Sequence, residues 1–350
     1  MTKFIIIRTF LLLSIITALY GDSLTIIAVG DIMMGTTYPD TNLPSNNGED
    51  LFTQVRSVLG DADLTMGNLE GTLLSGGVST KKVQRGRCYA FRTPPQFANN
   101  VSEAGFDFLN LANNHMNDFG YDGITSTMEA LEEVGIEYGG PYGQIGHLEF
   151  DSMSIAVVCF STSPNTVSLF DIRAAQELVA REARTNDVVI VSLHGGGEGL
   201  SYLHTRDTFE YYLGAPRGNV VAFAHAVIDS GADFVWGHGP HVPRALELYK
   251  RRLIAYSLGN FYTWGFNVSD ERGYAPILKI TFDSFGAFVH GQIVSALQKP
   301  RQPLELDSLH RAATLMHRLT AEDFPETSLF ITELGAIRRI ERALRYIELQ

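Results

Sequence analysis

Polar side chains able to bind a metal ion or carry a proton follow several apolar segments of this sequence. Five short apolar runs end in such clusters: Gly30-Asp31, Gly67-Asn68-Leu69-Glu70, Asn113-Asn114-His115, His194 with Gly195-Gly196-Gly197-Glu198, and Gly237-His238-Gly239-Pro240-His241. A sixth cluster, Ser257-Leu258-Gly259-Asn260, follows the run 253–256. Any one of them alone is typical of an ordinary strand-to-loop junction, but five repetitions argue against coincidence.

The residue types in these clusters indicate the chemistry. Carboxylate and amide oxygens together with several imidazoles suit a first-row divalent ion such as Zn, Mn or Fe, and they do not resemble an all-oxygen calcium cage. In open α/β sheets, ligands gather outside the carboxyl ends of the strands, where loops from neighbouring strands converge. Because paired strands lie about 5 Å apart, residues distant in sequence can share one coordination sphere.

The elements that must position these clusters alternate between strands and helices. Apolar runs at 24–29, 64–66, 106–112, 136–138, 155–160, 188–193, 234–236 and 253–258 predict buried strands. Helical spacing or helix-ending glycines predict helices at about 51–59, 94–104, 123–134 and 172–184. The segments 276–282 and 287–294, joined by Asp283-Ser284-Phe285-Gly286, predict a closing hairpin. This alternation is typical of an α/β fold.

The composition and net charge exclude several classes of protein and of binding partner. The chain has 350 residues, is 45% apolar and 19% charged, and is therefore an ordinary globular protein rather than a disordered one. Its net charge of −12 argues against nucleic acid as the partner. Two cysteines, Cys88 and Cys159, are too few for a disulfide scaffold or a cysteine-rich zinc module.

Residues 1–21 are predicted to be a secretory signal peptide or an N-terminal anchor. Lys3 and Arg8 flank the start of the apolar run Phe10 to Tyr20, which is followed by small and polar residues. A membrane-spanning helix needs about 20 apolar residues, more than this run supplies. We therefore expect export to the periplasm or another extracytoplasmic space, with the N-terminus as a membrane anchor if it is not cleaved.

The remainder divides into a main domain and a C-terminal segment. Residues 22–298 carry the alternating strands, helices and polar clusters. After Lys299 the alternation of strands and helices stops. Pro300 and Pro303 are followed by apolar residues at helical spacing over 306–319 and then by a charged tail. We predict a helical appendage at 299–350.

Seven motifs, in order from about residue 24 to 297, resemble the CapA family of poly-γ-glutamate capsule synthesis proteins. They are Val29-Gly30-Asp31-Ile32-Met33, Gly67-Asn68-Leu69-Glu70, Phe91-Arg92-Thr93-Pro94-Pro95, Ala112-Asn113-Asn114-His115, His194-Gly195-Gly196, Gly237-His238-Gly239-Pro240-His241-Val242 and Tyr256-Ser257-Leu258-Gly259-Asn260-Phe261. That family is similar to calcineurin-like metallophosphoesterases. The resemblance implies a four-layer α/β/β/α sandwich with two facing mixed sheets.

The resemblance also implies roles for single residues. The implied metal ligands, for one or two Mn, Fe or Zn ions, are Asp31, Glu70, Asn114, His194, His238 and His241. His115 is implied as the proton donor to the leaving group. Contacts to the substrate or behind the ligands are expected from Asn68, Arg92, Asn113, Glu198 and Asn260.

Three departures from the phosphoesterase pattern leave the metal number and the activity open. Ile32-Met33 follow Asp31 where the pattern has a histidine, and Asn68 replaces a bridging aspartate, with Glu70 the only nearby carboxylate. The closing His-x-His pair is stretched to His238 and His241.

The sequence is therefore compatible with two functions. One is an exported metal-dependent hydrolase that uses a metal-activated water on an anionic polymer or its ester. The other is a non-catalytic subunit that binds the polymer for export within a membrane-bound poly-γ-glutamate synthesis complex.

Overall fold

The computed structural model describes residues 23–84 and 88–340 and contains two large mixed sheets. The first has ten strands, ordered β20-β21-β18-β17-β1-β2-β5-β6 with β16 paired to β1 and β19 to β18. Their bounds are β1 Leu24–Met33, β2 Leu64–Leu69, β5 Phe108–Asn110, β6 Glu137–Gly139, β16 Asn260–Thr263, β17 Tyr274–Phe282, β18 Phe288–Leu297, β19 Glu305–Leu306, β20 Leu329–Ile331 and β21 Ala336–Arg339.

The second sheet has seven strands, ordered β14-β15-β13-β10-β8-β7 with β9 paired to β8. Their bounds are β7 Gly146–Phe150, β8 Met153–Ser161, β9 Val167–Ser168, β10 Val188–His194, β13 Phe234–His238, β14 Leu246–Tyr249 and β15 Arg252–Ala255. Two small two-stranded sheets pair β3 (Thr72–Leu73) with β4 (Arg92–Thr93) and β11 (Glu210–Tyr212) with β12 (Ala215–Gly218).

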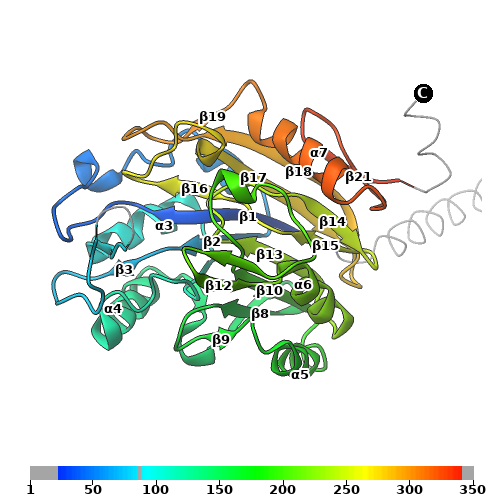
Figure 1. The fold of residues 1–350 in the computed structure, drawn as a ribbon, viewed down its shortest axis with the longest axis horizontal. Helices are drawn as coiled ribbons and strands as arrows, with labels where there is room; N and C mark the ends of the chain where they lie inside the picture. The colour runs from blue at the N-terminus through cyan, green and yellow to red at the C-terminus, as the bar shows by residue number, and fades with distance from the viewer. Residues whose placement is uncertain (1–22, 85–87, 341–350) are drawn as a thin grey trace, which may run out of the picture.

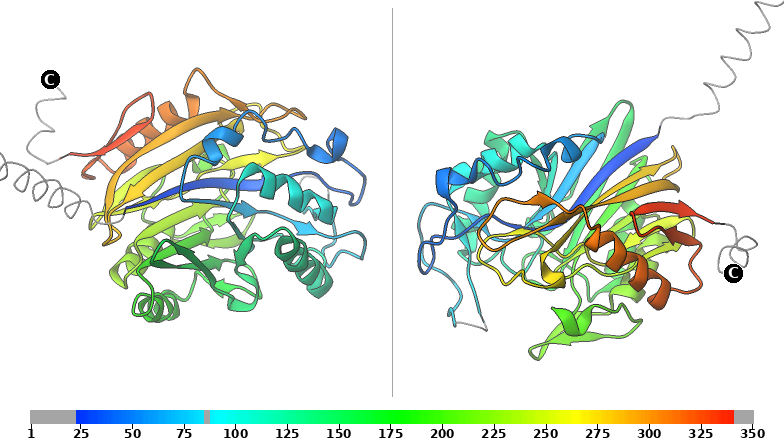
Figure 2. Two further views of the ribbon diagram at one scale, coloured as in Figure 1. Left: turned by 180° about the vertical axis from the view of Figure 1, so that it is seen from behind. Right: turned by 90° about the horizontal axis from the view of Figure 1, so that it is seen from above.

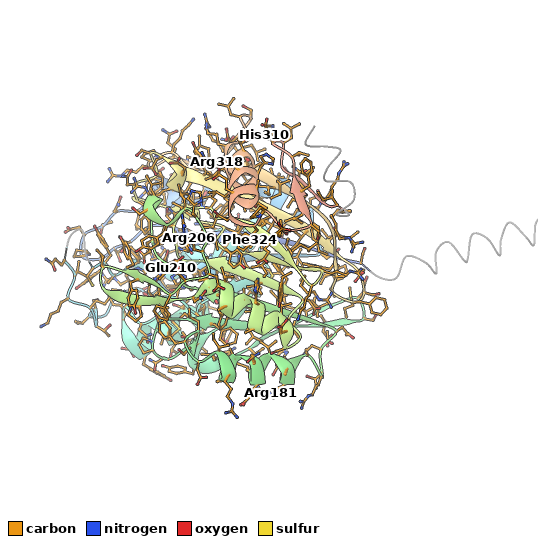
Figure 3. The ribbon with its side chains drawn as sticks, turned by 45° about the vertical axis from the view of Figure 1, so that its right-hand side comes forward. Arg181, Arg206, Glu210, His310, Arg318 and Phe324 are labelled. Atoms are coloured by element: carbon orange, nitrogen blue, oxygen red, sulfur yellow. The ribbon has the colours of Figure 1, made fainter. Side chains whose placement is uncertain are left out.

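The helices at 98–104 and 120–133 cover the outer face of the first sheet and those at 172–182 and 220–229 the outer face of the second, whereas the helix at 311–323 packs into the core between the sheets (Figures 1 and 2). The α-helices are α2 (Arg56–Leu59), α3 (Ala98–Ala104), α4 (Gly120–Glu133), α5 (Ile172–Glu182), α6 (Val220–Asp229) and α7 (Arg311–Asp323). Short 3₁₀ turns are η1 (Ser45–Gly48), η2 (Pro95–Phe97), η3 (Pro141–Gly143), η4 (Leu200–Tyr202) and η5 (Glu271–Gly273). In Figure 3, His310 and Arg318 mark α7 at the top of the view and Arg181 marks α5 at the bottom, with the sheets between them.

Alternating residues of the same strand enter different cores, which produces the layers. Ile26 and Ala28 of β1 pack between the sheets, in a core that also holds Trp236 of β13. Ile27 and Val29 face the opposite way, into the core shared with α3 and α4. A third core lies between the second sheet and α5 and α6. A strand that is buried on both faces has a continuous apolar sequence. The sequence alone therefore could not show which of its residues face the other sheet and which face the helices. The expected two facing mixed sheets with helices outside are confirmed.

The C-terminal segment differs from the all-helical expectation. Its described part contains α7, but β20 and β21 extend the first sheet through β18. Ala313 and Met316 of α7 enter the core between the sheets. Residues 299–340 therefore complete the sandwich.

The predicted signal or anchor at 1–21 lies outside the described residues, as does the charged tail after residue 340. Within 23–84 and 88–340, none of the helices combines the length and the apolar character needed to cross a bilayer.

Gly30 allows β1 to approach the loop before β16 closely. A Cβ at this position would lie 1.9 Å from the carbonyl oxygen of Gly259, the same oxygen that accepts the Asp31 N–H at 2.8 Å. The register between β1 and β2 shifts between Ala28 and Asp31 at this point. Only glycine fits, and the close approach places Asp31 opposite Asn260 of β16.

We expect Gly30→Ala to lower the free energy of unfolding by at least about 2 kcal/mol, because the new methyl group must push two backbones apart. Chemical denaturation measures this loss. The control is Gly76→Ala, where a Cβ meets nothing within 4 Å, and it should change stability by less than about 0.5 kcal/mol. Equal effects of the two substitutions would contradict this account of Gly30.

Candidate metal centre

A row of polar side chains crosses four neighbouring strands of the first sheet. The register pairs Asn110 with Asn68, Asn68 with Asp31, and Asp31 with Asn260. The Asn110 amide donates to Asn68 Oδ1 at 2.6 Å, and the Asn68 amide donates to Asp31 Oδ1 at 2.8 Å. All four side chains are buried. This relay fixes the Asp31 carboxylate through Oδ1, while Oδ2 faces His241 Nδ1 at 3.0 Å.

Glu70, just after β2, is the most unusual group in this region. It is fully buried, and neither carboxylate oxygen has a hydrogen-bond partner. Its Oε1 lies 3.7 Å from His241 Nε2, 3.9 Å from His115 Nε2 and 4.0 Å from His194 Nε2. Burial raises the pKa of Glu70 to about 8, and the negative Asp31 adds to the rise while His241 opposes it. A buried carboxylate without donors is costly unless a cation accompanies it.

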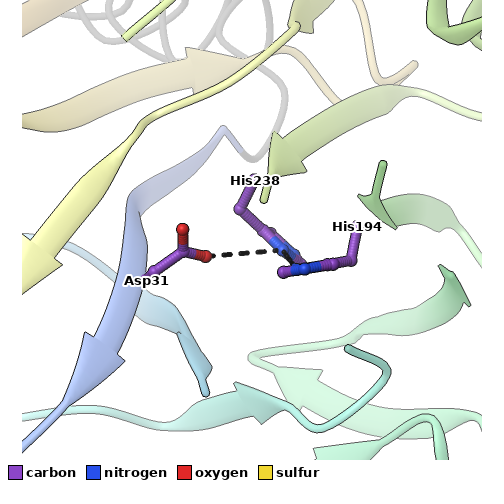
Figure 4. Close-up of side chains that lie close together, drawn as sticks. All are labelled: Asp31, His194 and His238. Carbon is purple, nitrogen blue, oxygen red and sulfur yellow. Dashed lines mark hydrogen bonds and ion pairs between the residues drawn. The ribbon is translucent and has the colours of Figure 1, made fainter. Parts of the chain in front are cut away.

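The second sheet supplies two imidazoles from adjacent strands. His194 ends β10 and His238 ends β13, directly opposite each other in the parallel register. Their Nδ1 atoms lie 2.9 Å apart, and His238 Nδ1 lies 3.9 Å from Asp31 Oδ1 (Figure 4). Burial lowers the pKa of His238 to about 4 and that of His194 well below its usual value, so both rings are neutral. Neutral imidazole is the form that binds a metal.

His241 joins the two carboxylates. Its Nδ1 lies 3.0 Å from Asp31 Oδ2 and 2.9 Å from Asn260 Oδ1, while its Nε2 faces Glu70. Although burial opposes its protonation, the carboxylates of Glu70 and Asp31 raise the pKa of His241 to about 10. Despite its burial, the Asp31 carboxyl has a pKa below its usual range, because the hydrogen bond and charge of His241 favour the carboxylate. In proteins, a metal-binding histidine commonly donates its second N–H to an oxygen, as Nδ1 does here toward Asn260.

These residues form two groups able to hold a metal ion: Asp31, His194 and His238, and Asp31, Glu70 and His241. In each group the candidate ligand atoms lie within 4.8 Å of one another. Two atoms bound about 2.1 Å from one cation are themselves about 3.0 to 3.4 Å apart, so modest side-chain adjustment suffices. Gly239 keeps the space open, since a Cβ there would lie 3.0 Å from His194 Nε2. The unpaired oxygens of Glu70 and the unpaired Nε2 of His194 fit a divalent cation.

His115 is held beside this cluster by a charged pair. Its Nδ1 lies 2.8 Å from Asp118 Oδ2, and the Phe91 N–H also donates to Oδ2 at 2.7 Å. Lys81 Nζ binds Asp118 Oδ1 at 2.6 Å. With Nδ1 turned toward Asp118, the His115 Nε2 points at Glu70. Burial lowers the pKa of His115, against the charge of Asp118.

Comparison with known proteins assigns the family. The model of the family "Bacterial capsule synthesis protein PGA_cap" matches residues 25–264, more than half of the chain. The chain belongs to this family.

The alignments with two curated relatives each cover about two thirds of this chain. "Capsule biosynthesis protein CapA" of Bacillus anthracis is 30% identical over 263 residues, covering 69% of this chain and 60% of the relative. "PGA biosynthesis protein CapA" of Bacillus subtilis is 26% identical over 257 residues, covering 69% and 63%. The chain thus spans less than two thirds of the length of either relative.

The fold is similar to solved phosphoesterases at low identity. The calcineurin-like phosphoesterase YfkN from Bacillus subtilis is 14% identical with a TM-score of 0.42, covering 86% of this chain and 98% of that one. A purple acid phosphatase from yellow lupin seeds is 10% identical with a TM-score of 0.41, covering 79% and 52%. Both TM-scores are below 0.5, so the description of the fold rests on this chain's own sheets.

The structure brings together most of the metal ligands expected for this PGA_cap protein. Asp31, Glu70, His194, His238 and His241 lie within a few ångströms of one another. Asn114 precedes His115, and its side-chain oxygen is buried without a partner, as a ligand oxygen would be.

The residues expected to contact substrate are placed differently. Asn68 and Asn113 are fully buried and bonded to protein groups: Asn68 Oδ1 accepts from Asn113 at 3.1 Å, and Asn113 Oδ1 accepts from the His115 N–H. They therefore position Asp31 and His115 rather than meet substrate. Asn260 orients His241. Glu198 lies at the rim, paired with Arg217 at 3.2 Å.

Arg92 also departs from its expected role. Its Nε and Nη2 donate to the hydroxyl and carbonyl oxygens of Thr37, and its Nη1 donates to the Gly77 carbonyl at 3.0 Å. The guanidinium also lies over the rings of Tyr38 and Phe119. These contacts join the loops that flank β4, and they leave Arg92 with a structural role.

Sequence reasoning missed Asp118, Lys81, Asn110, Ser192 and Arg217. Two of them carried a readable signal: Asp118 follows His115 by three residues, and Ser192 shares a strand face with His194 and bonds His238 Nε2 at 2.8 Å. Lys81 and Arg217 meet the site through loop and hairpin packing, for which the sequence holds no local signal.

Proposed function

We propose that this PGA_cap protein is an exported metal-dependent hydrolase of the phosphoesterase type, acting on an anionic polymer or its ester in capsule or poly-γ-glutamate biosynthesis. The observation that carries the proposal is Glu70, a fully buried carboxylate with both oxygens unpaired among three imidazoles. The names of the relatives from the two Bacillus species support the biological setting.

The ligand set favours one or two ions of Zn, Mn or Fe. Mixed imidazole and carboxylate donors suit these metals. Asp31 belongs to both ligand groups, so it would contribute to either site. When bound, the metal would supply Lewis acidity and lower the pKa of a water to about 7.

Residues of the protein itself would donate the proton and hold the metal ligands in their orientations. The Asp118 carboxylate accepts from Nδ1 of His115 and its charge would stabilise the doubly protonated ring, whose Nε2–H could then pass to the leaving group. Asn260 fixes the ring of His241, and the relay through Asn68 fixes Asp31. The indole N–H of Trp236 donates to the Val29 carbonyl at 2.9 Å, and the centroid of its ring lies 5.1 Å from that of His238, so it would help to hold this imidazole in place.

A second function, a non-catalytic subunit that binds the polymer for export in a membrane-bound synthesis complex, is favoured by one specific observation. Asn68 stands where the phosphoesterase pattern has a bridging aspartate, and its side chain is occupied by Asp31, Asn110 and Asn113. That position therefore supplies no ligand charge. Hydrolysis of an aryl phosphate by the metal-loaded protein would exclude this alternative.

The test of metal binding is elemental analysis of purified protein. We expect close to one or two equivalents of Mn, Fe or Zn in the wild type, a large loss in His194→Ala and His241→Ala, and no loss in His115→Ala. The reason is that His194 and His241 each belong to a group able to hold a metal ion, whereas His115 belongs to neither of these groups. Less than about one tenth of an equivalent in the wild type would contradict the proposed metal site. The same loss of metal in all three variants would contradict the separate roles of these histidines.

A further inference from the structure

An arginine that the metal site does not use lies beside both histidine loops. Arg217, in β12, is almost fully buried; its Nε donates to the Gly196 carbonyl at 2.7 Å, and its Nη2 lies 3.5 Å from the Gly239 carbonyl. Gly196 follows His194 by two residues, and Gly239 follows His238 directly. The guanidinium is therefore fixed at the junction of the two loops that carry these ligands.

The hairpin that presents Arg217 is held by a second arginine. Arg244 is fully buried and binds Glu210 of β11 at 3.0 and 3.2 Å, and it also donates to the Gly197 carbonyl at 2.8 Å. This ion pair ties β11 and β12 to the loop after β10. Arg217 is thus held by a rigid element rather than by a free loop.

The only carboxylate that pairs with Arg217 among the described ion pairs belongs to Glu198. Glu198 Oε1 lies 3.2 Å from Arg217 Nη2, with side-chain exposures of 17% and 7% respectively. Glu198 is therefore the more accessible partner of the pair. Within the described residues, the hydrogen bonds of Arg217 use Nε and Nη2, so Nη1 remains for a further acceptor.

We propose that Arg217 binds an anionic group, a carboxylate or a phosphate, of the ligand held at the metal centre, and that Glu198 occupies the guanidinium when no such ligand is present. This inference rests on the proposed function, because it names the chemical class of ligand for the same site. A guanidinium binds both kinds of anion through paired N–H groups. The guanidinium is adjacent to the ligand loops, since its Nη2 lies 3.5 Å from the carbonyl oxygen of Gly239, the residue after His238.

The test measures binding of two probes to Mn-loaded protein by calorimetry: inorganic phosphate and a γ-linked glutamate tripeptide. We expect Arg217→Met to raise the Kd of at least one probe about tenfold or more, because it removes a charge-assisted bond. Glu198→Gln should lower the Kd of the same probe about threefold, because the competing charge is gone. The probe that responds identifies the anion, and a response of both indicates a site for either.

Arg92→Met is the matched control, since Arg92 is also bonded to backbone carbonyls but lies at β4. It should leave both Kd values unchanged. Metal content is measured on every variant. If Arg217→Met loses metal or fails to fold, the opposite shift in Glu198→Gln decides the question. Unchanged Kd values in metal-loaded Arg217→Met, or a loss only in Arg92→Met, overturn the inference, whereas a wild type without metal overturns the proposed function instead.

Discussion

Glu70→Gln should weaken Mn²⁺ or Zn²⁺ binding at least about a hundredfold while leaving the metal-free protein as stable as the wild type at pH 7. The amide removes the charge that a cation requires, so affinity falls by at least as much as when a group behind a ligand is lost. With a pKa of about 8, Glu70 is mostly protonated at pH 7 when no metal is bound, and a neutral amide of the same size replaces it without penalty. Calorimetric titration with metal and denaturation of chelator-treated protein measure the two quantities.

The proton count gives this prediction a second readout. Metal binding at pH 7 should release about one proton from Glu70 and about one from His241 in the wild type, because a ligand carboxylate must be ionised and a ligand imidazole must be neutral. Glu70→Gln should release about one proton fewer than the wild type. Glu182→Gln is the matched control, since Glu182 is also buried but lies at the end of α5 beside Arg181. Full metal affinity in Glu70→Gln would show that Glu70 is not a ligand.

His115→Ala should reduce hydrolysis of an aryl phosphate by about a hundredfold to ten-thousandfold, the usual contribution of a positioned general acid. Metal content should stay at the wild-type value, because His115 belongs to neither of the two groups of side chains able to hold a metal ion. The ratio of turnover to bound metal, measured on the same preparation, separates a lost proton donor from a lost ligand.

His225→Ala serves as the control for His115→Ala. His225 is likewise paired with a carboxylate, Glu247 at 2.8 Å, but it lies on α6 outside the metal cluster. It should retain both turnover and metal. A comparable loss of turnover in both variants would remove the assigned role of His115, and a loss of metal in His115→Ala would make it a ligand instead.

Much of the candidate site could be predicted because metal-binding side chains occur where strands end. Asp31, His194 and His238 each lie at or near the carboxyl end of a buried strand, and the apolar runs before them mark those strands clearly. The helices α4 and α5 also lie close to the segments 123–134 and 172–184 that the sequence predicted. The segment 51–59 was less predictable, since only Arg56–Leu59 forms an α-helix and the rest packs as turns.

The roles of several residues were not predictable because they depend on register. Asn68 was expected either at the substrate or behind the ligands, and only its pairing between Asp31 and Asn110 makes it part of a buried relay. Arg92 looked available for an anion, but three of its donor groups are bonded to Thr37 and Gly77. Arg217 lies outside the motifs found in the sequence, and the β11–β12 hairpin brings it to the site.

By itself, the amino-acid sequence determined the kinds of ligand, the strand ends on which they lie and the family that the chain belongs to. Only the tertiary structure decided that two sheets face each other and bring Asp31 and Glu70 from one against His194 and His238 from the other. The reason is physical: periodicity reports how each segment is buried, whereas the pairing of strands and sheets depends on contacts between residues far apart in the chain.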